Sequence, residues 1–291
     1  MAIPTHRVTS LTNFVDQVIR VRDEWHVADI EHAKKCGDEE PDPISVWFRG
    51  QGNALWHLRP KLYRHAKTKF NENEIRAEFK LRGFQLMSET HVPKDDREWY
   101  FLMQHYRAPT RLLDWTDGAL IALYFAVESQ GPYKNSAVWM LDPVWFNHEV
   151  LNEVDENNYV EGILLPHWKE ADPWFPEPFE EVLHVTYPVA IDPPHVARRV
   201  SVQRSRFTVH GRSKRGLESF VVGMPELRLV KFVIANRVGK QILDHLSTCG
   251  IMETNVFPDL EGLSKELETK WTQLGFAASS KPRRPTTIKT P

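Results

Sequence analysis

The sequence predicts an α+β fold: one large domain with a central mixed sheet flanked by helices, and an irregular insertion near residues 150–181. Segments with apolar residues at helical spacing and short apolar runs of strand length both occur along the chain. The sequence contains no internal repeat, which argues against a solenoid or a propeller. The 291 residues can bury a sizeable core, so we expect a single domain rather than two.

The chain divides by composition into three parts. Residues 1–43 are expected to form an N-terminal helix and an acidic loop, with Ser10 capping the helix and its end before Gly37. Residues 44–275 are expected to form the main α+β domain. Residues 276–291 are polar, basic and rich in proline, which predicts a disordered tail.

The main domain opens with a short apolar run. Residues 44–48 predict a buried strand that carries Arg49 at its end. We expect Gly50 and Gly52 to turn the chain after it.

Further elements follow from periodicity and from proline positions. Residues 72–89 predict an amphipathic helix, and a second helix after Pro93 is expected to direct Trp99 and Tyr106 inward. Residues 119–127 are apolar almost all round, which predicts a buried central helix. The expected later elements are strands at 137–141, 182–189, 207–209 and 229–234, and helices at 239–249 and 260–274. The proline-rich and acidic residues 150–181 are expected to form an insertion or a lid.

Composition narrows the classes of function. The net charge of −2 gives no general attraction to nucleic acids or acidic membranes. The two cysteines, Cys36 and Cys249, suggest neither a disulfide framework nor a thiolate metal site, which fits a reducing cytosol. No run has the length of a signal peptide core or a membrane span, so we expect a cytoplasmic protein with no membrane partner.

Residues 98–116 combine many polar side chains with an apolar background, which marks them as the centre of a site. His105 could act as a general base, a hydrogen-bond donor or a structural histidine. Tyr106 could stack on a ring or belong to the core. Thr110 and Arg111 could bind phosphate oxygens, while Asp114 is expected to orient an arginine or to cap the following helix.

Two other segments add candidates. Arg49 could bind a phosphate or a carboxylate, or could form a buried pair with Asp114. Beyond it, Gln51, His57 and Arg59 offer groups that a nucleotide could use, whereas Arg64 is expected to be a solvated surface charge.

Residues 198–215 form the third candidate segment. They are basic and could bind polyphosphate or RNA, or could be a solvated face, with Gln203 and His210 the better candidates.

Several expected motifs are missing from the sequence. It has no phosphate-binding P-loop, no His-Glu-x-x-His and no Gly-x-Ser-x-Gly, which argues against a P-loop nucleotidase, a zincin or a serine hydrolase. The thirteen histidines show no convincing ligand spacing, so no metal site is predicted.

Short motifs resemble those of the FRG-domain family. They are Phe48-Arg49-Gly50, Gln104-His105-Tyr106, the Pro-Thr-Arg-Leu-Leu-Asp-Trp run of residues 109–115, residues 122–126, Gln203 with residues 207–210, and residues 257–262. A more distant resemblance to ADP-ribosyltransferases implies NAD as substrate, with Arg49 and Gly50 on the dinucleotide, Tyr106 stacked on nicotinamide, and Gln203 orienting the ribose or the acceptor. Glu98 or Gln203 would then stabilise the ribosyl cation.

The resemblance leads to two expectations of function. The first is an NAD- or nucleotide-binding transferase, in a bacterial or phage setting of stress response, toxin activity or antiviral defence. The second is a non-catalytic module that binds a nucleotide or RNA through Arg49, Arg111 and residues 198–215.

Overall fold

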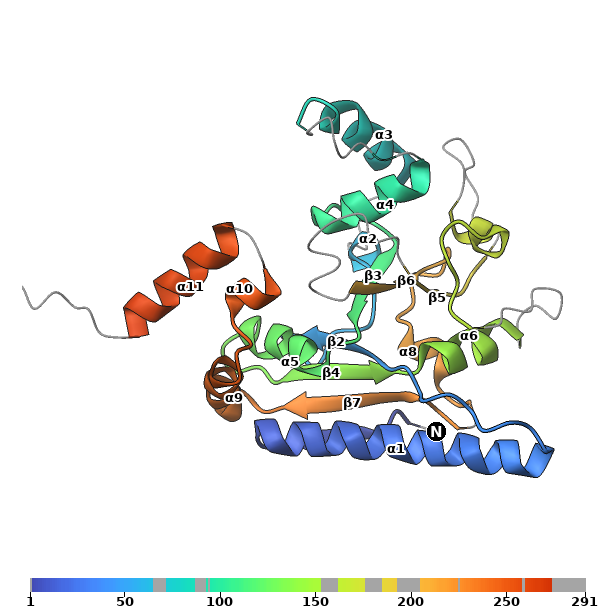
Figure 1. Cartoon of the computed structure of the whole chain (residues 1–291). Coiled ribbons are helices and arrows are strands. Elements are labelled where there is room, and N and C mark those ends of the chain that lie inside the picture. Colours follow the sequence, from blue (N-terminus) through green and yellow to red (C-terminus); the bar gives the residue numbers. More distant parts are fainter. Residues whose placement is uncertain are drawn as a thin grey trace, which may run out of the picture.

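The computed structural model describes residues 2–64, 72–86, 93, 95–152, 162–175, 185–192, 205–224, 226–257 and 260–273. Within these ranges one seven-stranded sheet has the order β1-β7-β4-β2-β3-β6-β5 (Figure 1). The strands are β1 (Thr5–Val8), β2 (Trp47–Gln51), β3 (Leu112–Thr116), β4 (Ser136–Leu141), β5 (Val189–Ile191), β6 (Ser205–Val209) and β7 (Leu229–Ile234). β1 runs parallel to β7 and the other neighbours are antiparallel, so the predicted α+β class with a mixed sheet is confirmed.

One face of the sheet is covered by α1 (Leu11–Cys36), α5 (Ala119–Glu128) and α9 (Asn236–Thr248). The predicted limits of α1 are confirmed: the Ser10 hydroxyl accepts the Asn13 N–H, and Gly37 ends the helix with a φ of 79°. As its composition predicts, α5 is a buried helix, and its side chains at Ala122, Leu123 and Ala126 are fully enclosed.

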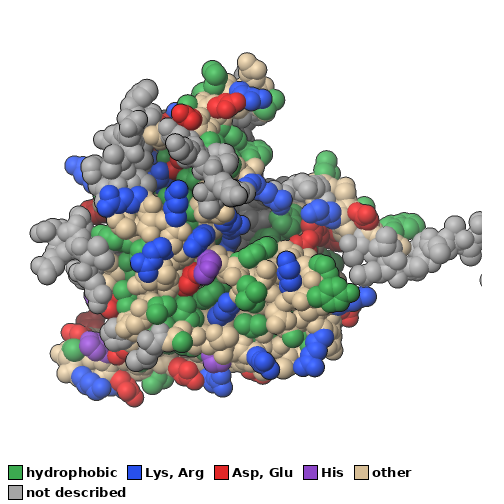
Figure 2. Space-filling model, turned by 180° about the vertical axis from the view of Figure 1, so that it is seen from behind, with side chains coloured by type: hydrophobic (Ala, Val, Ile, Leu, Met, Phe, Trp, Pro, Cys, Tyr) green, Lys and Arg blue, Asp and Glu red, His purple; other side chains and the backbone are tan. Residues whose placement is uncertain are grey.

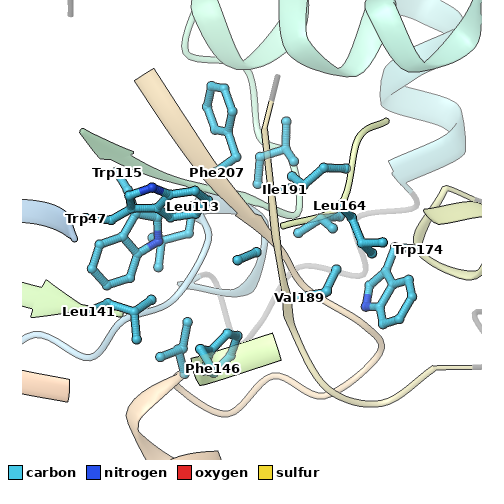
Figure 3. Close-up of a cluster of buried hydrophobic side chains, with 14 of the residues drawn as sticks. Trp47, Leu113, Trp115, Leu141, Phe146, Leu164, Trp174, Val189, Ile191 and Phe207 are labelled. Carbon is cyan, nitrogen blue, oxygen red and sulfur yellow. The ribbon is translucent and has the colours of Figure 1, made fainter. Parts of the chain in front are cut away.

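The opposite face carries a core rich in tryptophan (Figure 3). It is covered by α4 (Asp96–His105), α6 (Pro143–Asn152), a 3-10 helix (Lys169–Trp174) and α8 (Glu218–Val221). Leu164 and Trp174 belong to the expected insertion at 150–181, yet both are buried in this core. The described part of that segment is therefore a structural layer of the domain.

Two groups of helices extend away from the sheet. α2 (Lys61–Arg64), α3 (Glu72–Gly83) and α4 rise on one side, and α10 (Glu253–Val256) and α11 (Leu260–Gln273) lie beyond α5 (Figure 1). α3 ends at Gly83, earlier than the predicted residue 89. The predicted disordered tail at 276–291 lies outside the described residues.

Several local predictions were wrong. Gly50 does not turn the chain but continues β2, which begins at Trp47 rather than at residue 44. Tyr106 is not directed inward: it follows the end of α4 and is 66% exposed. Of the two roles expected for Asp114, helix capping is wrong, because Asp114 lies within β3 and α5 is preceded by Gly118, whereas its carboxylate does pair with Arg49.

The sheet splits open between β2 and β3. β2 pairs with β4 from Trp47 to Gln51, whereas its ladder to β3 is limited to Phe48 opposite Thr116. Where two strands diverge, their backbone N–H and C=O groups no longer pair with each other and need other hydrogen-bond partners. The split lies beside Arg49 and Asp114, two of the candidate residues named from the sequence.

Candidate functional site

A pocket of about 380 Å³ lies at the split between β2 and β3. This volume is within the range of about 300–1,000 Å³ that is typical of small-molecule sites. β2, β3 and β6 form its walls with α2, α4 and α5, together with Phe257 after α10. Its described lining consists of Phe48, Arg49, Gly50, Lys61, Arg64, Phe101, Gln104, His105, Arg107, Ala108, Leu112, Asp114, Trp115, Thr116, Phe125, Ser129, Ser205, Phe207 and Phe257.

Arg49 bridges the split. Its Nη1 donates to the backbone carbonyl oxygen of Asp114 at 2.5 Å and lies 3.6 Å from the Asp114 carboxylate. The side chain is 13% exposed, and its buried Nε has no hydrogen-bond partner among the described residues. Burial lowers the pKa of Arg49 to about 10; Asp114 opposes this shift and the nearby Arg64 adds to it.

A chain of hydrogen bonds holds the Asp114 carboxylate. Thr110 Oγ1 donates to Gln104 Oε1, and Gln104 Nε2 donates to Asp114 Oδ1 at 2.8 Å. The Thr110 hydroxyl in turn accepts the N–H of Leu112 at 3.2 Å. Because Thr110 donates to its oxygen, the Gln104 amide presents its nitrogen to Asp114.

Positive side chains outnumber negative ones around the pocket. Arg49, Lys61, Arg64 and Arg107 line it, and Asp114 supplies the single carboxylate among the described lining residues. Lys61 Nζ donates to the Arg107 carbonyl oxygen at 2.6 Å, and Arg107 has a φ of 59°, an uncommon conformation for a residue with a side chain. In the opposite view, Lys and Arg side chains surround the hollow between the α3–α4 side and the C-terminal helices (Figure 2).

A buried ion pair lies outside the pocket lining. Arg111 donates through its backbone N–H and its side chain to the Glu72 carboxylate, and both residues are buried. Burial alone would lower the pKa of Arg111, but Glu72 outweighs it and leaves this pKa above its usual value. The pair joins α3 to the start of β3.

A second buried group lies on β6. Trp115 Nε1 donates to Thr208 Oγ1 at 3.1 Å, and the Thr208 hydroxyl is 3.3 Å from His210 Nε2. Burial lowers the pKa of His210 to about 3, and the charge of Arg49 adds to this shift, so the ring is neutral at physiological pH.

The structure brings together only part of the predicted site. Arg49, Gly50, His105 and Asp114 line the pocket. Predicted residues that do not line it are Gln51, His57, Arg59, Glu98, Tyr106, Thr110, Arg111 and His210. Gln203 lies outside the described residues.

Several of the residues outside the pocket lining have evident structural partners. Gln51 accepts a hydrogen bond from Trp139 Nε1 at 3.0 Å, and the ring of His57 contacts Glu218 at 2.5 Å. Arg206, within the basic segment, pairs with Asp117 and Asp192. The functional roles of all these residues remain predictions.

Sequence reasoning missed several pocket residues. Arg64, expected to be a solvated charge, is exposed yet lines the pocket, as do Lys61 and Arg107. Isolated basic residues near loops carry no signal that separates them from ordinary surface charges. Phe207 and Phe257 lie in segments noted for family resemblance, and that signal could have identified them.

The described residues contain no cluster of three or more His, Cys, Asp or Glu side chains placed to hold a metal ion. Among the same residues, no helix combines the length and the apolar character that crossing a bilayer requires.

Comparison with known proteins finds a family model that matches part of the chain. A family model described as the FRG domain matches residues 44–135, which span β2, α2, α3, α4, β3 and α5. Most of the pocket lining lies within this stretch, whereas Ser205, Phe207 and Phe257 lie beyond it. No curated protein and no solved structure matches the chain.

Proposed function

Residues 44–135 of this chain form an FRG domain, and from that premise we propose that the pocket at the split of the sheet binds a nucleotide, with NAD as the substrate of an ADP-ribosyl transfer. The observation that carries the proposal is the lining: four cationic side chains and one carboxylate beside six aromatic residues among those described. A nucleotide combines phosphate charge with flat aromatic rings, and this lining complements both.

The cationic groups favour phosphate as the charged part of the ligand. Arg49 and Arg64 lie close enough for the charge of Arg64 to lower the pKa of Arg49. Arg64 is exposed by surface area, but partial desolvation of its guanidinium group lowers its pKa as well. Two guanidinium groups repel each other unless an anion lies between them, and arginine binds phosphate oxygens with paired donors. The buried Nε of Arg49, which has no hydrogen-bond partner within the described part of the chain, is one donor for this purpose.

The aromatic side chains favour a ligand with flat rings. Phe48, Phe101, Phe125, Phe207 and Phe257 line the pocket with Trp115. Phe125 and Phe257 meet edge to face, with ring centroids 5.7 Å apart. Phe48, Phe101, Trp115 and Phe207 are buried in the cores, whereas Phe125 and Phe257 are partly exposed. Phe125 and Phe257 are therefore the residues placed to stack on a base, an interaction that contributes about 1–3 kcal/mol per base.

Transfer of ADP-ribose would need a group that stabilises positive charge on the ribose. Of the two groups expected from the sequence, Glu98 does not line the pocket. Gln203 stands two positions before Ser205, which does line it. Gln203 therefore stays a prediction that mutagenesis can test.

The experiment measures binding before turnover. Purified protein is titrated with NAD, ADP-ribose and AMP by calorimetry and thermal shift, and nicotinamide release is followed by chromatography. A ligand at 100 times its Kd stabilises the folded state by about 2.7 kcal/mol. Arg49→Ala is expected to weaken the binding of ADP-ribose about 10- to 100-fold, since a hydrogen bond to a charged group contributes about 1.5–3 kcal/mol.

Arg22→Ala is the matched control, because Arg22 is an exposed arginine on α1 that pairs with Asp23. Its affinity for ADP-ribose should equal that of the wild type. Absence of binding for all three nucleotides would refute the proposal. Binding without nicotinamide release, with or without added cell lysate, would favour the non-catalytic nucleotide-binding module.

The RNA-binding alternative has a separate test. Arg206 is engaged by two carboxylates, so the described part of the basic segment offers less free charge than its composition suggests. Titration with single-stranded RNA at two salt concentrations would reveal binding by its steep salt dependence. The expected setting in stress response or antiviral defence stays a prediction.

A further inference from the structure

We propose that the carboxylate of Asp114 is the catalytic group of this pocket, which stabilises the ribosyl cation as nicotinamide leaves. This inference rests on the proposed function. Within β3, the neighbours of Asp114 in sequence, Leu113 and Trp115, are both buried, whereas the side chain of Asp114 is 54% exposed. Among the described lining residues it is the only carboxylate.

The carboxylate is not the hydrogen-bond acceptor that positions Arg49. The hydrogen bond of Arg49 goes to the backbone carbonyl oxygen of residue 114, which every amino acid would supply. The carboxylate oxygen lies 3.6 Å from the same nitrogen, so it is an ion-pair partner that raises the pKa of Arg49 but not its hydrogen-bond acceptor at ordinary distance. More than half of the Asp114 side chain is exposed, which leaves the carboxylate able to contact a ligand as well.

The carboxylate is nevertheless held in a defined orientation. Gln104 donates to Oδ1, and the Gln104 amide is fixed by Thr110, a fully buried residue. Such support from neighbouring side chains is typical of groups whose orientation matters in catalysis. The negative charge of Asp114 repels a phosphate bound in this pocket. We therefore expect the carboxylate to have a function that offsets this loss of affinity.

The chemistry that suits this place is dissociation of a glycosidic bond. The bond between ribose C1′ and the nicotinamide nitrogen breaks, and its electron pair goes to that nitrogen, which becomes neutral. The positive charge moves to the ribose as an oxocarbenium ion that Asp114 stabilises. An acceptor hydroxyl or a water then attacks C1′, and its proton passes to the Asp114 carboxylate.

The test separates catalysis from binding. Wild type and Asp114→Asn are compared for the Kd of ADP-ribose and for the rate of nicotinamide release from NAD. The amide keeps the size of the side chain and removes the charge. We expect the affinity for ADP-ribose to be equal or higher, and nicotinamide release to slow by about 100-fold or more.

A second variant covers the case in which Asp114→Asn fails to fold. In Asp114→Ala, added sodium formate can place a carboxylate in the vacated space, and it should restore part of the nicotinamide release. Asp16→Asn on α1, where Asp16 is exposed, is the control and should release nicotinamide at the wild-type rate.

Each outcome has one meaning. Turnover of Asp114→Asn within about fivefold of wild type would overturn this inference and leave the proposed function intact. Loss of ADP-ribose binding in Asp114→Asn would make Asp114 a positioning residue and also overturn it. Failure of the wild type to bind any of NAD, ADP-ribose and AMP would instead refute the proposed function itself.

Discussion

Replacement of Gly50 by alanine should strongly destabilise this protein. A Cβ at position 50 would overlap the carbonyl oxygen of Ala122 and would lie 2.7 Å from the backbone nitrogen of Ala126. It would also lie 2.9 Å from Cβ of Phe125. Ordinary contacts between carbon atoms are about 3.5–4.0 Å, so α5 would have to move by roughly 1 Å.

The cost follows from which atoms collide. Two of the three nearest atoms belong to the backbone of a buried central helix, so no side chain can rotate away to relieve the overlap. Overpacking of a core costs about 1–3 kcal/mol, and we expect about 3 kcal/mol for Gly50→Ala. With a urea m-value near 3 kcal/mol/M, the midpoint of unfolding should fall by about 1 M.

The assay is urea denaturation followed by circular dichroism, with Gly83→Ala as the matched control. Gly83 is the last residue of α3, and a Cβ there would meet Trp99 at an ordinary 3.6 Å. Alanine should therefore be neutral or stabilise the protein by up to about 1 kcal/mol, as helix propensity predicts. An unfolding free energy of Gly50→Ala within about 0.5 kcal/mol of the wild type would refute the reasoning.

Two further predictions concern buried ionisable groups. Glu72→Ala should destabilise the fold by about 3–5 kcal/mol, because it leaves Arg111 buried without its partner. The double variant Glu72→Leu/Arg111→Met should recover much of this stability, as measured by urea denaturation. Equal instability of the single and the double variant would contradict the prediction. His210 has a folded-state pKa of about 3 against 6.5 when unfolded, so the unfolded chain binds more protons between these values and stability falls as pH decreases through this range. As the pH is lowered from 6 to 4.5, the unfolding free energy of the wild type should therefore fall by about 1.4 kcal/mol per pH unit more than that of His210→Gln. If the unfolding free energies of the two proteins change in parallel with pH, His210 is not a buried neutral histidine.

The structure shows a distinct packing or bonding role for each residue of the Phe-Arg-Gly motif. Phe48 is buried against α5 and the neighbouring strands. Arg49 spans the split of the sheet and donates to the carbonyl oxygen of residue 114. Gly50 allows α5 to lie directly on β2. The sequence predicted the buried phenylalanine and, as one alternative, the pairing of the arginine with Asp114, but it assigned the glycine to a turn.

Elements with strong local signals were predicted well. Ser10 and Gly37 bound α1 because capping depends on adjacent residues alone. The all-apolar composition of α5 likewise predicted burial. β1 and β3 were missed: each is short, and β3 carries Asp114 within an apolar run, so strand formation there depends on pairing with β6 rather than on local preference.

The sequence by itself determined the mixed α+β class and the main helices, and it named Arg49 and Asp114 among the candidates that line the pocket. These features depend on composition and on spacing within one segment. The tertiary structure decided that the sheet splits between β2 and β3, that Lys61, Arg64 and Phe257 join the pocket, and that Tyr106 does not. Contacts between segments far apart in the chain depend on packing, and neither periodicity nor spacing within a segment encodes them.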